Sequence, residues 1–350
     1  MTVASSRWLY DAVPAVAEED LAIARRRQGQ LTKPAGSLGI LEALGVRLAA
    51  MQGTERPYLE RVGVAVFAAD HGVASEDVSA YPQSVTGEMV RNFARGGAAI
   101  SVLARLWRLR LRVYNLGTVL PLEDLPDVRD CRIAAGTRNL RREAAMTPEQ
   151  LAVAMATGRD AVEDAARARC QLFIGGEMGI GGTTAATAVA CALLNRPPLE
   201  LVGPGTGLDG AGVAHKTAVI DQALARCRPQ TPLGALAELG GFELAALAGA
   251  LIRCAQRGLP SLVDGYIATT AALVAVRLRP EVAPWLFYAH RSAEPGHGAL
   301  LAALATQPLL TLDMALGEGS GAAVALPLLR AAAALHGEMA TFAEAGVSRR

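Results

Sequence analysis

Five short apolar runs recur along the chain, and longer segments with helical spacing separate them. The runs are RVGVAVFAAD (61–70), LRLRVYNLG (109–117), CQLFIGGE (170–177), LPSLVDGY (259–266) and PWLFYAH (284–290). A weaker sixth run is TLDMALGEG (311–319). Buried strands that alternate with helices are typical of a parallel sheet whose two faces are covered by helices. The expected fold class is therefore α/β.

Helical patterns fill the spaces between these runs and occupy both ends of the chain. Residues 87–106 and 148–170 are Ala/Leu-rich with helical spacing, and residues up to about 55 contain helical patterns without a convincing strand. The tail from about Gly321 is also Ala/Leu-rich. We expect a large α/β catalytic domain over 58–320, and a small helical domain built from 1–57 together with 321–350.

Composition excludes several functional classes. Hydrophobic residues make up 51% of the 350 residues and aromatic residues only 4%, so the core must be large and built from small side chains. The net charge is +1, from 34 basic and 33 acidic residues, and no basic stripe with interleaved aromatics indicates nucleic-acid binding. The longest helical apolar run, Leu244–Ile252, is far shorter than the roughly 20 residues that span a bilayer.

The cysteines and the first residues bear on cellular location. Five scattered cysteines without a CxxC pair argue against both a disulfide framework and a zinc site. The first twenty residues lack a basic region followed by an apolar core, so a signal peptide is not expected. These features predict a cytoplasmic protein.

The stretch LFIGGEMGIGGTTAATAVA (172–190) reads as a buried strand, a glycine-rich turn and a helix. Gly179, Gly181 and Gly182 allow close approach of a ligand to the backbone, and a helix that begins near Thr183 presents free N–H groups. The stretch fits neither GxxxxGK[ST] nor GxGxxG in the correct frame, which weakens a nucleotide or dinucleotide interpretation. A phosphate site and a turn whose glycines serve packing alone both remain open.

A second glycine-rich loop, GPGTGLDGAGVAHK (203–216), also leads into a helix. Asp209 is a candidate N-cap. Lys216 lies well inside the predicted helix, from where its long side chain could reach back over the N-terminus. Two such loops and a lysine suit one phosphate monoester, although a surface lysine is the ordinary alternative.

Two further polar segments follow predicted strands. HRSAEPGH contains His290 and His297, but their spacing matches no reliable metal-ligand pattern, so we predict no metal site. GEGSG places Glu318 between glycines at a predicted strand end. An acid there is suited to proton transfer, although a solvated turn glutamate is the ordinary interpretation.

Taken together, these segments resemble the nicotinate-nucleotide–dimethylbenzimidazole phosphoribosyltransferase family. The resemblance covers nearly the whole chain in order, through LTKPAGSLGILE (31–42), FAADHGVASEDVSAYPQSVTGEMVRNFARGGAAISVLAR (67–105), GEMGIGGTTAATA, GTGLDGAG, LGGFELAALAGA (239–250), VDGYIATTAAL, HRSAEPGH and LDMALGEGSGAA. It implies a Rossmann-like parallel α/β domain, a small helical domain from both termini, and a homodimer. It also implies transfer of phosphoribose from nicotinate mononucleotide to 5,6-dimethylbenzimidazole, with inversion at the anomeric carbon and no cofactor.

The resemblance assigns roles to individual residues. Glu318 matches the general base, and Glu177 lies where it could bind ribose hydroxyls or offset positive charge in the transition state. Phosphate and ribose contacts fall on Gly179, Gly181, Gly182, Thr183, Thr184, Gly205 and Lys216. The aromatic-base pocket falls on Ser79, Tyr81, Glu88, Met314 and Leu316.

Two departures from the family pattern concern specificity. Gly182 stands where the family often has asparagine, which removes one side-chain hydrogen bond. Glu88 stands where glutamine is expected near the base pocket. The same transferase with a different preferred azole or purine base is therefore the main alternative. A Rossmann dehydrogenase and a non-catalytic nucleotide-binding protein are rivals, but the first lacks its glycine fingerprint and the second does not explain two site carboxylates.

Overall fold

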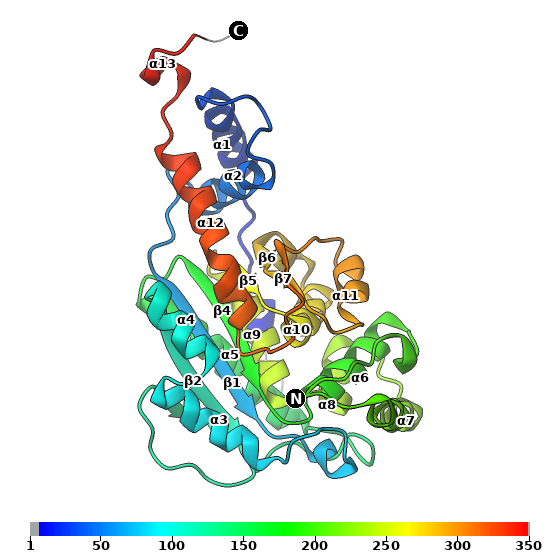
Figure 1. Ribbon diagram of the computed structural model, residues 1–350. Helices are drawn as coiled ribbons and strands as arrows, with labels where there is room; N and C mark the ends of the chain where they lie inside the picture. Colours follow the sequence, from blue (N-terminus) through cyan, green and yellow to red (C-terminus); the bar gives the residue numbers. More distant parts are fainter. Residues whose placement is uncertain (1–6, 349–350) are drawn as a thin grey trace.

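The computed structural model describes residues 7–348 and has a single large parallel sheet at its centre (Figure 1). The strand order is β3-β2-β1-β4-β5-β6, and every neighbouring pair is parallel. The strands are β1 Val62–Ala69, β2 Arg110–Gly117, β3 Val128–Asp130, β4 Leu172–Met178, β5 Ser261–Val263 and β6 Leu286–Tyr288. The predicted α/β class with a parallel sheet is confirmed.

The sixth predicted strand was wrong in extent and placement. Only Leu310–Thr311 is extended there, as β8, and it pairs with β7 (His290–Arg291) outside the main sheet. Positive φ angles at Asp313 and from Gly317 to Gly319 prevent a longer strand. The sixth strand of the main sheet is instead β3, a short edge strand that was not predicted from the sequence.

Helices cover both faces of the sheet, and the side chains of β1 show why. Phe67 belongs to one hydrophobic core, shared with α5 and α9, whereas Val64 and Val66 belong to a second core on the other face. This alternation is the period of two that a strand buried on both faces requires. The second core is completed by side chains from α2, α3, α4 and α12.

The helical bounds follow from local signals. The first-core helices are α5 Pro148–Arg167, α6 Gly182–Leu194, α7 Gly210–Arg226, α8 Pro232–Leu239, α9 Phe242–Gln256, α10 Tyr266–Leu278 and α11 His297–Ala303. The others are α1 Glu18–Gln30, α2 Ile40–Gln52, α3 Ser84–Arg95, α4 Ala99–Trp107, α12 Ser320–Glu338 and α13 Phe342–Ala345. The segment 87–106 is split into α3 and α4 because Gly96 ends α3 with a φ of 80°.

The terminal helices contact one another, as expected. Arg27 of α1 donates hydrogen bonds to the carbonyl oxygens of His336 and Gly337 near the end of α12, and α2 packs along the same helix. Figure 1 shows α12 running from the sheet to α1 and α2. The segment Arg7–Tyr10, which precedes α1, packs elsewhere, because its Leu9 is buried in the hydrophobic core of the large sheet. The domain boundaries at 57/58 and 320/321 stay a prediction.

Residues 7–348 contain no helix that combines the length and apolar character needed to cross a membrane. The apolar run 244–252 lies in α9, where its side chains are almost fully buried against the sheet. The hydrophobicity of this run therefore reflects the protein core.

Candidate active site

The glycine-rich turn between β4 and α6 lies at the carboxyl edge of the sheet. Gly181 adopts a φ of 98° as the N-cap of α6, a conformation that favours glycine. A side chain on Gly179 could not fit, because its Cβ would lie 2.2 Å from the carbonyl oxygen of Ala69. Thr184 is fully buried, and its hydroxyl has no hydrogen-bond partner among the described residues. At the start of α6, the N–H groups of Gly182 and Thr184 already donate to the carbonyl oxygens of Gly179 and Gly181, so the glycines serve the packing of the turn.

The second glycine-rich loop meets this turn through Lys216. The Lys216 ammonium donates to the hydroxyl oxygen of Thr183, 2.9 Å away, and to the carbonyl oxygen of Gly203, 3.2 Å away. Asp209 caps α7, since its carboxylate accepts from the N–H of Gly212 at 2.8 Å. Both the predicted cap and the predicted reach of the lysine are therefore present, and Lys216 is fully buried rather than on the surface.

Burial lowers the pKa of Lys216 to about 8, and Glu294 opposes this shift. The Glu294 carboxylate accepts from the N–H of Gly205 at 3.0 Å. Its second oxygen is buried without a hydrogen-bond partner among the described residues. Glu294 was not predicted from the sequence, because HRSAEPGH was considered only as a metal motif. Its position after a strand end was the available signal.

Glu177 and Glu318 are brought together by their backbones. The N–H of Glu318 donates to the carbonyl oxygen of Glu177 at 3.2 Å. A Cβ on Gly317 would lie 2.3 Å from the Glu177 carboxylate, so the loop approaches this side chain as closely as glycine permits. Glu318 itself has a φ of 66°, between two glycines with positive φ. A non-glycine residue in this conformation stores roughly 1–2 kcal/mol of strain, which is typical of functional sites.

Both carboxyl groups are poised to hold a proton more tightly than usual. Burial raises the pKa of Glu177 well above its ordinary value, and the negative charges of Glu243, Asp264 and Glu318 add to the effect. Burial likewise raises the pKa of Glu318, partly offset by the N–H of Ile100, which donates to the carboxylate at 3.3 Å. A carboxylate with a raised pKa is a stronger base near neutral pH.

Asp264 fixes the loop that carries Glu318. Its two carboxylate oxygens accept from the N–H of Gly319 at 3.1 Å and from the N–H of Ala322 at 2.8 Å. Because Asp264 follows β5, it ties the end of that strand to the start of α12. The DGY segment is visible in the sequence, but the local pattern gave the aspartate no role.

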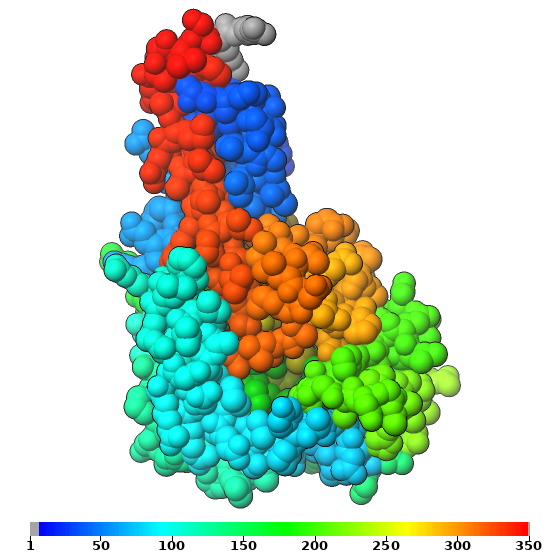
Figure 2. Space-filling model, in the orientation of Figure 1, coloured from blue at the N-terminus to red at the C-terminus, as the bar shows by residue number. Residues whose placement is uncertain are grey.

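One cavity at the carboxyl edge brings several predicted residues together. It is lined by Glu177, Thr183, Asp264, Gly265, Tyr266, Ile267, Ala268, His290, Ser292, Glu294, Ala315, Leu316 and Gly317. Figure 2 shows a recess on this face, between the cyan, green and orange-red segments. Of the predicted site residues, Glu177, Thr183 and Leu316 line this cavity, whereas Glu318, Lys216 and the glycines of the turn do not.

The other base-pocket residues do not line this cavity. Ser79 lies beside the second glycine loop, with its hydroxyl 3.0 Å from that of Thr206. Tyr81 and Glu88 are exposed, and Met314 is half-buried. Leu316 is 59% exposed although it borders the cavity. An aromatic-base pocket made of all five residues stays a prediction.

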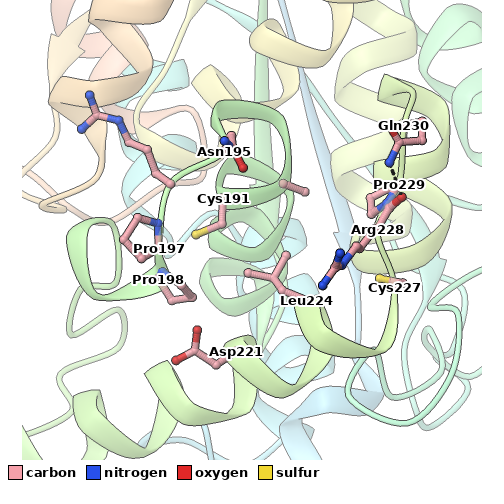
Figure 3. Close-up of a pocket in the computed structure, with 12 residues that line it drawn as sticks. Cys191, Asn195, Pro197, Pro198, Asp221, Leu224, Cys227, Arg228, Pro229 and Gln230 are labelled. Carbon is pink, nitrogen blue, oxygen red and sulfur yellow. Dashed lines mark hydrogen bonds between the residues drawn. The ribbon is translucent and has the colours of Figure 1, made fainter.

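A larger cavity of about 560 Å³ lies at the C-terminal ends of α6 and α7, away from the glycine turn (Figure 3). It is lined by Cys191, Ala192, Asn195, Arg196, Pro197, Pro198, Asp221, Leu224, Cys227, Arg228, Pro229 and Gln230. None of the predicted site residues is among them. Within residues 7–348, no group of three or more His, Cys, Asp or Glu side chains is arranged to hold a metal ion.

Comparisons with known proteins agree with this geometry. Residues 13–347 match the model of a family described as phosphoribosyltransferase. A nicotinate-nucleotide–dimethylbenzimidazole phosphoribosyltransferase of Pseudomonas aeruginosa (strain UCBPP-PA14) is 60% identical over 348 residues, which cover 99% of each chain. A protein of that name from Pseudomonas putida (strain W619) is 59% identical over 98% of each chain.

Solved structures give the same result. A crystal structure described as the same phosphoribosyltransferase, from Thermus thermophilus, superposes with a TM-score of 0.90 at 47% identity. It covers 95% of this chain and 99% of its own. A second structure, titled CobT from the same organism, has a TM-score of 0.92 at 48% identity and covers 95% of this chain and all of its own.

Proposed function

We propose that this chain, which belongs to the nicotinate-nucleotide–dimethylbenzimidazole phosphoribosyltransferase family, transfers phosphoribose from nicotinate mononucleotide to 5,6-dimethylbenzimidazole. The products are nicotinate and α-ribazole 5′-phosphate, the nucleotide of the lower ligand of cobalamin. The observation that carries the assignment of residues is the convergence of Glu177, Glu318 and the Lys216–Thr183 pair at one edge of the sheet.

The phosphate of the mononucleotide would bind where the two glycine loops meet. Lys216 would supply a charged donor there, close to Gly205. Gly179, Gly181 and Gly182 allow the turn to pack against Ala69, His71 and Ile267, and so set the position of the backbone beside the proposed phosphate site. Thr183 and Thr184 add hydroxyl groups at the N-terminus of α6. The negative charge of Glu294 partly restores the pKa of Lys216 that burial lowers.

The reaction breaks the bond between the anomeric carbon and the pyridinium nitrogen, and that electron pair leaves with nicotinate. No proton is needed by this leaving group. Positive charge develops on the ribose as the bond lengthens, and the Glu177 carboxylate, held beside the site, would stabilise it electrostatically. Burial, together with the negative charges of Glu243, Asp264 and Glu318, explains why Glu177 is costly to ionise, and a cationic sugar would offset that cost.

Attack by dimethylbenzimidazole forms the new carbon–nitrogen bond on the face opposite the leaving group, which converts a β-riboside into an α-riboside. The second ring nitrogen of the base then loses its proton to Glu318. The raised pKa of Glu318 matches this role, and Asp264 holds the loop in place while the proton moves. Ser79, Tyr81, Glu88, Met314 and Leu316 are the proposed contacts of the aromatic base.

The test of this function is product analysis. The protein is incubated with nicotinate mononucleotide and a panel of benzimidazoles and purines, and nicotinate and riboside products are separated and their anomeric configuration determined. Release of nicotinate with formation of α-ribazole 5′-phosphate supports the proposal. A strong preference for another base would support a role of Glu88 and Gly182 in base specificity. Absence of any riboside product would refute the proposed function.

We also propose that the protein is a cytoplasmic homodimer. The family resemblance and the small side chains of an alanine-rich chain support a dimer. All five cysteines are free thiols, which fits the reducing environment of the cytoplasm. Sedimentation at working concentration should give twice the mass of 36.4 kDa. An active, stable monomer would contradict the dimer.

A further inference from the structure

The imidazole of His71 lies directly behind the glycine turn of the site. A Cβ on Gly179 would lie 3.2 Å from its Nε2, one on Gly182 3.6 Å from the same atom, and one on Gly181 3.0 Å from the Cβ of His71. The three glycines thus share one side-chain neighbour. The imidazole therefore packs against the backbone of the turn and limits the positions that this backbone can take.

Glu243 holds this imidazole from the other side. The Nε2 of His71 and the Oε1 of Glu243 are 3.0 Å apart, and both side chains are fully buried. Gly241, just before α9, is required by the pair because its Cβ would lie 2.3 Å from the imidazole and 2.4 Å from the carboxylate. Gly241 of the LGGFE segment therefore makes room for an internal ion pair.

Burial and neighbouring charges determine what holds the His71–Glu243 pair together. Burial alone lowers the pKa of His71, but Glu243 and Asp70 outweigh it, and the pKa is raised above the ordinary histidine value. Neither nitrogen of His71 and neither oxygen of Glu243 has a well-aligned hydrogen bond among the described residues. The pair therefore depends on charge attraction across a short distance, which makes it sensitive to loss of either partner.

We propose that His71 and Glu243 form a positioning pair that sets the backbone of the turn 179–182 and thereby the affinity for nicotinate mononucleotide. The inference rests on the proposed function, because it takes the phosphoribosyl group as the ligand of this turn. Neither residue contacts the reacting atoms in the proposed mechanism. Their action is transmitted through the three glycines on one side and, through the charge of Glu243, to Glu177 on the other.

The first measurement is calorimetric affinity for nicotinate mononucleotide in His71→Gln and Glu243→Gln. Loss of one well-aligned hydrogen bond to a charged phosphate costs roughly tenfold or more in affinity, so we expect affinity to fall at least about tenfold in each variant. The Michaelis constant for dimethylbenzimidazole should change less than about threefold. The double variant, whose two amides can hydrogen-bond each other, should bind no more weakly than either single variant.

The matched control is His336→Gln. His336 is also a buried histidine, with its Nδ1 2.7 Å from the side-chain oxygen of Gln28, but it lies between α1 and α12, away from the glycine turn. This variant should lose stability without losing mononucleotide affinity. If it weakens binding as much as His71→Gln does, general destabilisation explains the effect and the positioning role is refuted.

A second readout is the acid limb of the turnover–pH profile. The acid limb depends on the ionisation of Glu177, whose pKa is raised by burial and by the negative charges of Glu243, Asp264 and Glu318. Removing the charge at position 243 should move the acid limb of Glu243→Gln to lower pH, which a purely structural role would not do. An acid limb unchanged from the wild type would contradict the coupling to Glu177.

A measurement on the unmodified protein covers variants that fail to fold. The ¹⁵N imidazole signals of His71 should shift when nicotinate mononucleotide is added, and stay in place when dimethylbenzimidazole alone is added. Unchanged signals with saturating mononucleotide would overturn the proposal. Product analysis of the wild type tests the proposed function separately, since mononucleotide binding is measured here without the second substrate.

Discussion

The ammonium nitrogen of Lys216 lies 2.9 Å from the hydroxyl oxygen of Thr183, a residue 33 positions earlier in the chain. This contact joins the N-terminal turn of α6 to the second turn of α7. A buried cation is costly unless it is paired, and here a hydroxyl, a carbonyl oxygen and the Glu294 carboxylate share that task. The two glycine loops therefore meet at one place, which is the proposed phosphate site.

Lys216→Ala should weaken nicotinate mononucleotide binding while leaving the aromatic base almost unaffected. A charge-assisted hydrogen bond contributes roughly 1.5–3 kcal/mol, which corresponds to about 10- to 100-fold in the Michaelis constant for the mononucleotide. Steady-state kinetics with each substrate varied in turn measures both effects. An unchanged constant for the mononucleotide would remove Lys216 from the site.

Glu318→Gln should lower turnover by about 10²–10⁴-fold with little change in mononucleotide binding. Glutamine keeps the size of the side chain and can still accept from the Ile100 N–H, but it cannot take a proton at neutral pH. An N-alkylated benzimidazole, which has no proton to lose, is the control substrate. It should lose far less activity in the variant than dimethylbenzimidazole does.

Equal losses for both substrates would show that Glu318 positions the base or stabilises charge. No loss with either would make the carboxylate a turn residue. The proton acceptor would then have to be sought elsewhere, beginning with Glu177.

Glu177→Gln should stabilise the fold at neutral pH while reducing activity. The pKa of Glu177 is raised in the folded state, so its ionisation opposes folding: stability is lost as pH rises from about 4.5 through the raised pKa. Glutamine carries no such cost. Thermal unfolding should show a midpoint a few degrees higher than the wild type at pH 7 and little difference at pH 4. An unchanged or lower midpoint at pH 7 would contradict the burial of an uncompensated charge.

Gly176→Ala should disable the site by displacing the Glu318 loop. The added Cβ would lie 2.2 Å from the carbonyl oxygen of Glu318, a backbone atom that cannot rotate away. Overpacking of this kind costs about 1–3 kcal/mol of stability. Turnover should fall by more than the loss of folded protein explains, because the Glu318 loop is displaced directly. Gly210→Ala is the control, because its Cβ would meet nothing within 4 Å and alanine favours the first turn of α7. That variant should keep full activity.

The strands that were predicted correctly from the sequence are those with a clear burial signal. β1, β2 and β4 are long apolar runs, whereas β3 has only three residues, VRD, at the exposed edge of the sheet and carries no such pattern. The run 311–319 failed for the opposite reason. It contains apolar residues, but Leu312 and Leu316 are exposed at the rim of the site and do not form part of the core.

The candidate site divides in a similar way. Glycine loops and Glu318 could be found from the sequence because glycine spacing and a flanked acid are local patterns. The roles of His71, Glu243 and Asp264 could not, since each depends on a partner far along the chain. Gly241, just before α9, was the local trace of the His71–Glu243 pair, and the physical reason for this glycine appears only once the imidazole is in place.

The helix α12 begins two residues after Glu318 and ends against α1. The helix has 19 residues, which corresponds to a length of about 28 Å, and Pro327 lies in its interior. Arg330, near the middle of this helix, donates hydrogen bonds to the carbonyl oxygens of Leu59 and Trp107. The packing of α1 and α2 on α12 therefore holds in place the helix that begins beside Glu318, the proposed general base.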